Sequence, residues 1–453
     1  MTTTPKPFTH QIAGTNFWLE KDITANFSDP GTGKTRATLD AIAQRNSPGR
    51  ALVIAPLSIL ASSWGEDIKK FTPQLTYAIA DAKNRQQAFD SGAKIVLINP
   101  DGVKAIVKDL SWLKDFDTLV VDESTAFKHH NSQRSKALAK ISEHIRYKII
   151  LTGTPNSNTV CDLWHQIYLL DEGKRLGKNF NQFRISVCNP SIVDTGGGKT
   201  AVKWVDKPNA NAVVSAALAD ITFRVKFEDV LEIPPNLTRN IYVDQPPKLM
   251  KMYRDFMRDS VLMLQSGEIT AMNAGVRVRK ALQLLTGAVY DETGGIHTIH
   301  HDRYNLVMDL VEETDACVVA FNWRHERLAL CEEAERRKLT YAVIDGDTPF
   351  EQRGDIVRAF QNGELRVVIA HPQSAGHGLT LTRGNRTIWA SPTYNAEHYQ
   401  QFCRRIYRAG QTRKTETIHI AARGTIEESV YSRLGDKLDA MDELLKYAKE
   451  LTD

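Results

Sequence analysis

The sequence predicts an α/β protein with two parallel-sheet domains in tandem and a mainly helical insertion or connector between them. At about 150 residues per domain, 453 residues leave room for about three domains. Short apolar runs alternate with stretches of helical length near both ends of the chain, the pattern of βαβ units around a buried parallel sheet. The middle of the chain lacks this alternation, so we expect domains at 1–172 and 301–453 and a connector at 173–300.

Five strands are predicted in each half. Apolar runs mark strands in the first half at 23–27, 51–56, 94–99, 118–121 and 147–151, and in the second half at 316–321, 341–345, 366–370, 386–390 and 415–421. The connector includes a predicted helix over 247–265. The last 28 residues, 426–453, carry apolar side chains at helical spacing and predict an amphipathic helix.

Composition excludes several classes of protein. Hydrophobic residues make up 42% and charged residues 25% of the chain, as in an ordinary globular protein rather than a fibre or a disordered chain. The sequence has no apolar run of about 18 residues and no signal-peptide pattern, and its five cysteines are scattered. We therefore expect an intracellular, cytoplasmic protein without membrane partners. The net charge of +4 alone does not indicate a nucleic-acid partner.

The strongest local motif is a glycine-rich segment that follows the first strand and precedes a helix. Its glycines allow main-chain amides to approach phosphate oxygens, and the helix that follows adds its positive N-terminal end. Lys34 is expected to reach the β and γ phosphates of ATP, and the Thr35 hydroxyl to bind Mg²⁺. The nucleotide-binding candidates in this segment are Ser28, Asp29, Pro30, Gly31, Thr32, Gly33, Lys34 and Thr35. A second GKT at 198–200 precedes a β-like run instead of a helix and is interpreted as a hairpin tip.

Two adjacent carboxylates end the strand at 118–121. The carboxyl end of a buried parallel strand is where α/β sheets place their ligands. Asp122 is therefore the predicted Mg²⁺ ligand, and Glu123 is predicted to orient and deprotonate the attacking water.

Two arginines near the end of the chain are predicted to stabilise the negative charge of the transition state. If the segment 401–411 is helical, Gln401, Arg405 and Arg408 share one face at spacings i, i+4 and i+7. Planar guanidinium groups bind phosphate oxygens well, so Arg405 and Arg408 are expected to bind nucleotide and to act in catalysis.

In their order along the chain, these motifs resemble superfamily 2 helicase motors, and among them the Snf2-type double-stranded DNA translocases. The likeness runs from about residue 8 to 440 and includes 151–155 (LTGTP), 374–381 (SAGHGLTL), 401–411 (QFCRRIYRAGQ) and 424–428 (GTIEE). It implies two RecA-like domains of a minimal bacterial or phage-like, DEAD/DEAH-related motor. It also implies that Gln11 reads adenine. The residues expected to couple hydrolysis to DNA are Thr152, Gly153, Thr154, Gly376, Gly378 and Gln401.

The resemblance also implies DNA contacts with little sequence preference. They are Pro56, Leu57, Ser58, Asn99, Asn322, Gln373 and Ser374. Two basic clusters, one at 128–136 and one made by Arg277, Arg279 and Lys280, either add charge to this surface or are solvated faces. The sequence departs from the usual family pattern at 122–125, which reads DEST, and at Arg404 and Tyr407, which replace an acidic residue and a histidine.

The function expected from these motifs is an ATP-dependent motor on duplex or forked DNA, serving replication, recombination or repair. ATP and Mg²⁺ are the expected cofactors, and proteins of replication or recombination are the expected partners. The protein is expected to be a monomer in a bacterial or phage-infected cell. Two alternatives stay open: a strand-separating helicase on single-stranded DNA or RNA, and a nucleotide-switched DNA-bound scaffold with slow hydrolysis.

Overall fold

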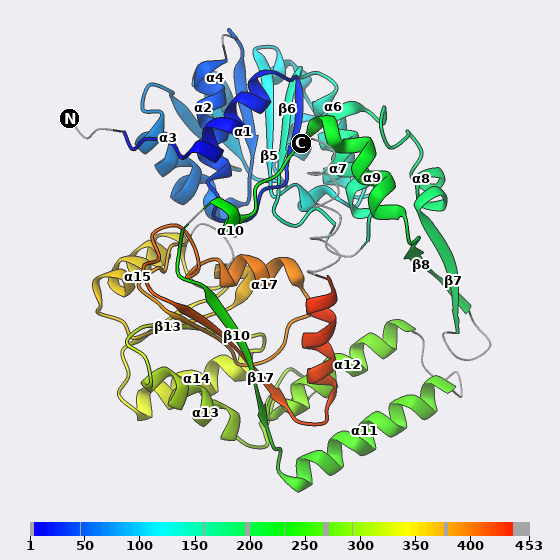
Figure 1. Ribbon diagram of the computed structural model, residues 1–453, viewed down its shortest axis with the longest axis vertical. Helices are drawn as coiled ribbons and strands as arrows, with labels where there is room; N and C mark the ends of the chain where they lie inside the picture. The colour runs from blue at the N-terminus through cyan, green and yellow to red at the C-terminus, as the bar shows by residue number, and fades with distance from the viewer. Residues whose placement is uncertain are drawn as a thin grey trace. The chain divides into compact units, whose positions relative to one another are not determined.

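The computed structural model describes residues 4–45, 47–156, 159–194, 200–230, 232–265, 271–291, 293–375 and 379–437. The chain divides into two compact units (Figure 1). The first comprises 1–189, 206–232 and 437–453, and the second comprises 190–205 and 233–436. No helix among the described residues combines the length and the apolar character needed to cross a membrane.

The first unit is built on a seven-stranded, fully parallel sheet in the order β3-β4-β2-β5-β6-β1-β9. Its strands are β1 (Ile23–Asn26), β2 (Arg50–Ile54), β3 (Tyr77–Ala80), β4 (Ile95–Ile98), β5 (Phe116–Asp122), β6 (Tyr147–Leu151) and β9 (Thr222–Phe223). The five strands predicted for this half are confirmed. Nearly every residue of β2, β4, β5 and β6 is buried, which explains their continuous apolar sequences.

Helices surround this sheet. They are α1 (Thr9–Leu19), α2 (Lys34–Gln44), α3 (Glu66–Phe71), α4 (Arg85–Asp90), α5 (Val103–Ile106), α6 (Gln133–Ser142), α7 (Asp162–Asp171), α8 (Phe180–Val187), α9 (Ala210–Leu218) and α10 (Phe227–Val230). Short 3-10 or π turns cover Leu57–Ile59, Leu60–Gly65, Leu110–Leu113, Ser124–Phe127 and Ala219–Ile221. A hairpin of β7 (Cys188–Asp194) and β8 (Thr200–Asp206) forms a separate two-stranded sheet, and the residues at its tip, 195–199, lie outside the described part of the chain.

The second unit has a six-stranded parallel sheet in the order β10-β17-β16-β13-β15-β14. Its strands are β10 (Asn236–Val243), β13 (Cys317–Ala320), β14 (Tyr341–Ile344), β15 (Val367–Ala370), β16 (Arg386–Trp389) and β17 (Thr415–Ala422), with a small antiparallel pair of β11 (Ala288–Tyr290) and β12 (Ile296–Thr298). The five predicted strands of this half are also confirmed.

The helices of the second unit are α11 (Pro247–Gln265), α12 (Ala271–Leu285), α13 (Asp302–Glu312), α14 (Arg324–Arg336), α15 (Phe350–Asn362), α16 (Pro372–Ala375) and α17 (Ala396–Cys403). The predicted helix over 247–265 is present as α11. Of the predicted C-terminal helix, 426–437 is helical, and 438–453 lies outside the described residues.

The segment 173–300 differs from a simple helical connector because it supplies one strand to each large sheet. β9 pairs with β1, and β10 pairs along its whole length with β17. β9 has only two residues, and β10 is a polar edge strand with four of its eight residues in a row exposed, so neither has the apolar run that marks a buried strand. The boundaries at 172 and 300 stay predictions.

Candidate nucleotide site

The glycine-rich segment forms a tight loop between β1 and α2. Gly31 and Gly33 have φ angles of +89° and +82°, which residues with a Cβ atom rarely adopt. Gly33 caps the N-terminus of α2, so the loop ends where the helix exposes its first amides. The Lys34 ammonium lies back over the loop and donates to the carbonyl oxygens of Ser28 (2.7 Å) and Asp29 (3.2 Å). The segment thus has the backbone form that a phosphate-binding loop needs.

Gln11 lies directly against this loop, and its reading of adenine stays a prediction. Its Nε2 donates to the Thr32 carbonyl at 3.3 Å, and a Cβ atom on Gly33 would lie 2.1 Å from that nitrogen. The sequence did not single out His10 as a site residue, yet its Nε2 also contacts the Thr32 carbonyl, at 2.8 Å. The Phe8 ring stacks on the His10 imidazole with centroids 5.6 Å apart. The start of α1 is therefore tied to the loop by two side chains.

The two carboxylates lie at the end of β5, beside the lysine of the loop. Trp64 Nε1 donates to Asp122 Oδ2 at 2.8 Å, and the Glu123 amide donates to Asp122 Oδ1 at 3.0 Å. Burial raises the pKa of Asp122, while the Trp64 hydrogen bond and the charge of Lys34 act in the opposite direction. Glu123 adopts a left-handed backbone conformation, with φ at +52°. Such a conformation in a residue other than glycine is a feature of functional turns.

Asp122 and Thr35 offer the oxygen ligands that Mg²⁺ prefers. Asp122 is buried, and each of its carboxylate oxygens accepts one donor, which fixes its orientation. No group of three or more His, Cys, Asp or Glu side chains suited to a metal occurs among the described residues. Mg²⁺ is usually held by one or two protein ligands, and phosphate oxygens and water complete its coordination.

The segment 152–156 packs against the phosphate loop and connects to the residue after the carboxylates. A Cβ atom on Gly153 would lie 2.5 Å from Pro30 Cδ, so the two loops touch at this glycine. Ser124 Oγ donates to Gln166 Oε1 at 2.6 Å, and Gln166 Nε2 donates to the Pro155 carbonyl at 2.7 Å. Gln166, on α7, thus bridges the two motifs, and nothing in its local sequence marks it.

Thr152 and Thr154 are placed by a local hydrogen bond. The Thr154 amide donates to Thr152 Oγ1 at 3.1 Å, and both residues are buried. Two predicted residues, Gly376 and Gly378, lie outside the described residues.

The segment 224–227, almost 200 residues further along the chain, binds the side chains of the phosphate loop. The Val225 amide donates to Ser28 Oγ at 3.1 Å, and the Phe227 amide donates to Asp29 Oδ2 at 3.1 Å. Arg224 Nη2 lies 4.0 Å from Asp29 Oδ1. Ser28 and Asp29, both predicted to bind nucleotide, therefore direct their side chains toward 224–227.

The second unit brings Arg405 and Arg408 together, but not on a helix. The prediction that Gln401, Arg405 and Arg408 share one helical face is wrong, because α17 ends at Cys403. The chain then turns, and the Leu381 amide donates to the Arg405 carbonyl at 2.9 Å. Both guanidinium groups donate to the Leu379 carbonyl, Arg405 at 3.3 Å and Arg408 at 2.9 Å.

The same turn is held by a buried glutamine. Gln411 Nε2 donates to the carbonyl oxygens of Thr382 (3.0 Å), Gly384 (2.8 Å) and Ile406 (3.3 Å). These contacts fix the segment after α17 to the loop before β16 and place the two arginines. Gln401 itself is buried on α17, where its Nε2 donates to Glu397 Oε1 at 3.4 Å.

The predicted nucleic-acid contacts gather at the carboxyl edge of each sheet. In the first unit, Pro56, Leu57 and Ser58 follow β2 and Asn99 follows β4, its direct neighbour, with Ile54 opposite Ile98. In the second unit, Asn322 follows β13, and Gln373 and Ser374 follow β15. Asn322 Nδ2 donates to Ser391 and Pro392, so this side chain holds the loop.

The two basic clusters differ in their surroundings. Lys128 lies 3.3 Å from the Asp162 carboxylate, and both side chains are largely buried, so that charge is neutralised within the first unit. Arg279 on α12 is exposed, and its guanidinium carbon lies 5.1 Å from the centre of the Trp323 ring, next to Asn322. The cluster at Arg279 therefore continues the candidate surface of the second unit.

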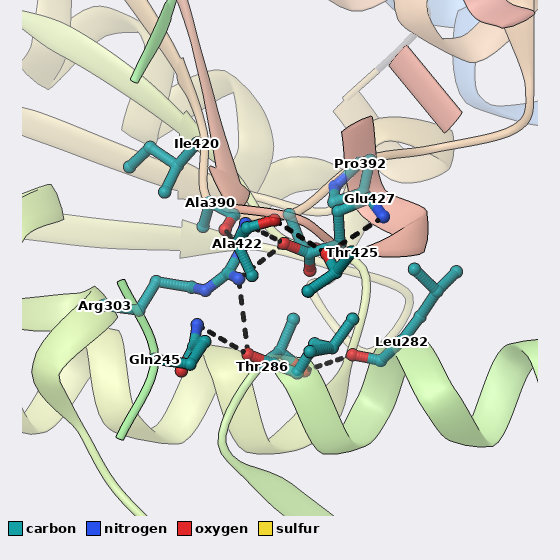
Figure 2. A network of polar contacts seen from close by, with 12 residues as sticks. Gln245, Leu282, Thr286, Arg303, Ala390, Pro392, Ile420, Ala422, Thr425 and Glu427 are labelled. Atoms are coloured by element: carbon teal, nitrogen blue, oxygen red, sulfur yellow. Dashed lines mark hydrogen bonds and ion pairs between the residues drawn. The ribbon is translucent and has the colours of Figure 1, made fainter. Parts of the chain in front are cut away.

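A fully buried ion pair holds the segment 424–428 (GTIEE) of the second unit in place (Figure 2). Arg303 Nη2 lies 2.6 Å from Glu427 Oε2, and both side chains are completely buried. Arg303 also donates to the Ala390 carbonyl at 2.9 Å and to the Leu285 carbonyl at 3.3 Å, while the Ala422 amide donates to Glu427 at 2.6 Å. The pair thereby joins α12, α13, β17 and the helix at 426–437.

A phosphate loop beside a strand that ends in two carboxylates, in a chain with two parallel sheets, defines an ATPase of the helicase type. The SNF2-related domain model matches residues 10–287, and the helicase conserved C-terminal domain model matches residues 302–410. The chain therefore belongs to the SNF2-related family. It is a nucleic-acid-dependent ATPase, as the motifs predicted.

The relatives include phage and animal proteins. Putative protein p41 of Acyrthosiphon pisum secondary endosymbiont phage 1 is 29% identical, and the match covers 99% of both chains. The DNA annealing helicase and endonuclease ZRANB3 of Bos taurus is 26% identical over 97% of this chain but only 40% of its own length. Among solved structures, the Sulfolobus solfataricus SWI2/SNF2 ATPase core in complex with dsDNA matches with 21% identity, a TM-score of 0.44, and coverage of 97% of this chain and 92% of that one.

Proposed function

We propose that this protein uses ATP hydrolysis to move along or remodel duplex or forked DNA. The observation that carries the proposal is the convergence of Gln11, Lys34, Asp122 and Glu123 on one loop of the first unit, where each has a separate task in ATP hydrolysis. Arg405 and Arg408, paired on one carbonyl of the second unit, supply the remaining charge.

Each residue has a chemical role that follows from its atoms. Lys34 exchanges the carbonyls of Ser28 and Asp29 for the oxygens of the β and γ phosphates. Thr35 and Asp122 hold Mg²⁺, which neutralises charge on the phosphates when it is bound. Glu123 orients the attacking water and accepts its proton.

In this proposal ATP lies between the two domains, and Arg405 and Arg408 approach its γ phosphate when the domains close. An arginine supplied in this way is worth about 10³ to 10⁵ in rate, so hydrolysis would depend on closure. Repeated closure and opening would move the two sets of nucleic-acid contacts past each other along the DNA. The predicted contacts are loops that suit sugar and phosphate rather than base edges, so little sequence preference is expected.

Names of relatives support the choice of substrate and setting. ZRANB3 is described as a DNA annealing helicase, and p41 belongs to a phage. We therefore propose action on duplex or forked DNA during replication, recombination or repair in a bacterial or phage-infected cell, with the protein as a monomer. Proteins of those processes are the proposed partners.

The experiment is a steady-state ATPase assay with no nucleic acid, single-stranded DNA, duplex DNA, forked DNA and RNA. Strong stimulation by duplex or fork supports the proposal. Stimulation by single strands or RNA favours the strand-separating helicase, and none with any of them favours the scaffold.

The Glu123→Gln variant tests the proposed chemistry. It is expected to bind ATP and to lose about 10² to 10⁴ in turnover, because a positioned general base contributes that much. The matched control is Glu143→Gln, an exposed carboxylate beyond the end of α6 that should have no effect. Substantial turnover in the Glu123 variant would contradict the mechanism.

A further inference from the structure

Two cysteines of the first unit have their sulfur atoms in contact. Cys161 immediately precedes α7, and Cys188 is the first residue of β7, 27 positions later; their Sγ atoms are 3.4 Å apart. Both are free thiols. A disulfide bond has an S–S length of about 2.05 Å, so a movement of about 1.4 Å would form one. We propose that Cys161 and Cys188 are a site of reversible thiol–disulfide exchange with a low-molecular-weight disulfide of the glutathione class.

The main chain on both sides of the pair is held by hydrogen bonds. The Lys207 amide donates to the Val187 carbonyl at 2.9 Å, beside Cys188. The Asp206 carboxylate joins the two sides, because Oδ2 accepts the Val160 amide at 3.0 Å and Oδ1 accepts the Cys188 thiol at 3.2 Å. The contact between the sulfurs is thus set by the structure around them rather than by two mobile side chains.

The two thiols differ in access, which assigns their order of reaction. Cys188 is only 1% exposed, whereas Cys161 is partly exposed. The Cys161 thiolate attacks one sulfur of oxidised glutathione, forms a mixed disulfide and releases one glutathione thiolate, which takes up a proton from water. Cys188 Sγ then attacks Cys161 Sγ, its proton passes to Asp206 Oδ1 and on to solvent, and the second glutathione leaves. Two protein thiols are oxidised while one glutathione disulfide is reduced to two thiols.

The surroundings of the two thiols keep them protonated near neutral pH. Burial raises the pKa of Cys161, and burial together with the contacts to Cys161 and Asp206 raises the pKa of Cys188. Because only the thiolate attacks, exchange is expected to accelerate as the pH rises. The disulfide would fix the start of α7, the helix whose Gln166 bridges Ser124 and Pro155.

The test incubates the whole protein with excess oxidised glutathione, unfolds it in denaturant together with an alkylating reagent that blocks the remaining thiols, and maps peptides by mass spectrometry without reduction. We expect one peptide that joins Cys161 to Cys188, lighter by two hydrogen atoms than its reduced parts and released by dithiothreitol. Cys317, Cys331 and Cys403 should be alkylated, since no other contact between cysteine sulfurs occurs within the described ranges. Alkylation of both Cys161 and Cys188 after long incubation would overturn the proposal.

Two variants test the order of reaction. Cys188→Ser should stop at a mixed disulfide on Cys161, and Cys161→Ser should leave Cys188 unmodified; glutathione on Cys188 instead would refute the assigned order. Oxidation of the wild-type protein, a test that requires no substitution, should raise the melting temperature of the first unit by roughly 5 to 10 °C. Unchanged melting of fully cross-linked protein would show that the bond does not fix the start of α7. None of these outcomes depends on DNA or ATP, so they are independent of the proposed function.

Discussion

Gly153 offers the sharpest test that the 152–156 segment and the phosphate loop work as one unit. Replacing it with alanine would place a Cβ atom 2.5 Å from Cδ and 2.8 Å from Cγ of Pro30. Carbon atoms pack at about 3.5 to 4.0 Å, so the overlap is about 1 Å. The Pro30 ring is fixed to the main chain of the loop and cannot rotate away, so the loop itself must move.

The expected loss follows from that displacement. A misplacement of about 1 Å in a catalytic site can cost about 10² in rate, equivalent to about 2.7 kcal/mol in the activation barrier. We therefore expect Gly153→Ala to lower kcat for ATP about 100-fold while the protein stays folded, since inserting one methyl group into a packed site costs about 1 to 3 kcal/mol of stability. The assay measures kcat and KM with saturating DNA, with circular dichroism and thermal unfolding measured in parallel.

Gly346→Ala is the matched control, because a Cβ atom there meets nothing within 4 Å. It should hydrolyse ATP at the wild-type rate. If Gly153→Ala is folded and its kcat lies within about twofold of the wild type, the two loops tolerate separation. The prediction that the 152–156 segment and the phosphate loop work as one unit would then be refuted.

Three further predictions concern other parts of the chain. Arg408→Ala should bind ATP normally and lose about 10³ or more in turnover; weaker ATP binding with normal turnover would contradict the assigned role. Burial lowers the pKa of His165 from 6.5 to about 4, so the neutral imidazole stabilises the fold above pH 6.5 and roughly 3 kcal/mol of the free energy of unfolding is lost as the pH falls toward 4. The free energy of urea unfolding, measured against pH, should vary less in His165→Gln. Arg279→Ala should reduce the slope of log affinity for duplex DNA against log salt by about 0.9, and Arg358→Ala, with an exposed side chain, should not.

The sequence predicted the parts of the fold that are buried and apolar. The central strands of both sheets were predictable because residues such as those of β4 and β15 are buried on both faces and must be apolar. The edge strand β10 was not, because its sequence mixes polar and apolar residues on an exposed edge and its position depends on pairing with β17, almost 180 residues away.

The same distinction applies to the candidate site. The loop at 28–35 and the carboxylates at the end of β5 carry their chemistry in consecutive residues, so spacing alone locates them. His10, Trp64 and Gln166 act through contacts with segments far away in the sequence, so local spacing does not show what each of them touches. The turn after Cys403 was mistaken for a helix because its hydrogen bonds go to the loop at 379–384, which no local periodicity reports.

The supports of the phosphate loop explain why the first unit includes residues well beyond 172. Three segments distant in sequence hold the loop: Gln11 contacts Thr32, Gly153 contacts Pro30, and 225–227 binds Ser28 and Asp29. The last of these is reached only after the β7–β8 hairpin and α9, and it directly follows β9, the strand that pairs with β1. Because β1 leads directly into the loop, a movement of β9 would be passed to the loop through β1. A movement of 224–227 would be passed to it through the side chains of Ser28 and Asp29. The return of the chain through this segment is therefore a structural support of the proposed ATPase site as well as a connection to the second unit.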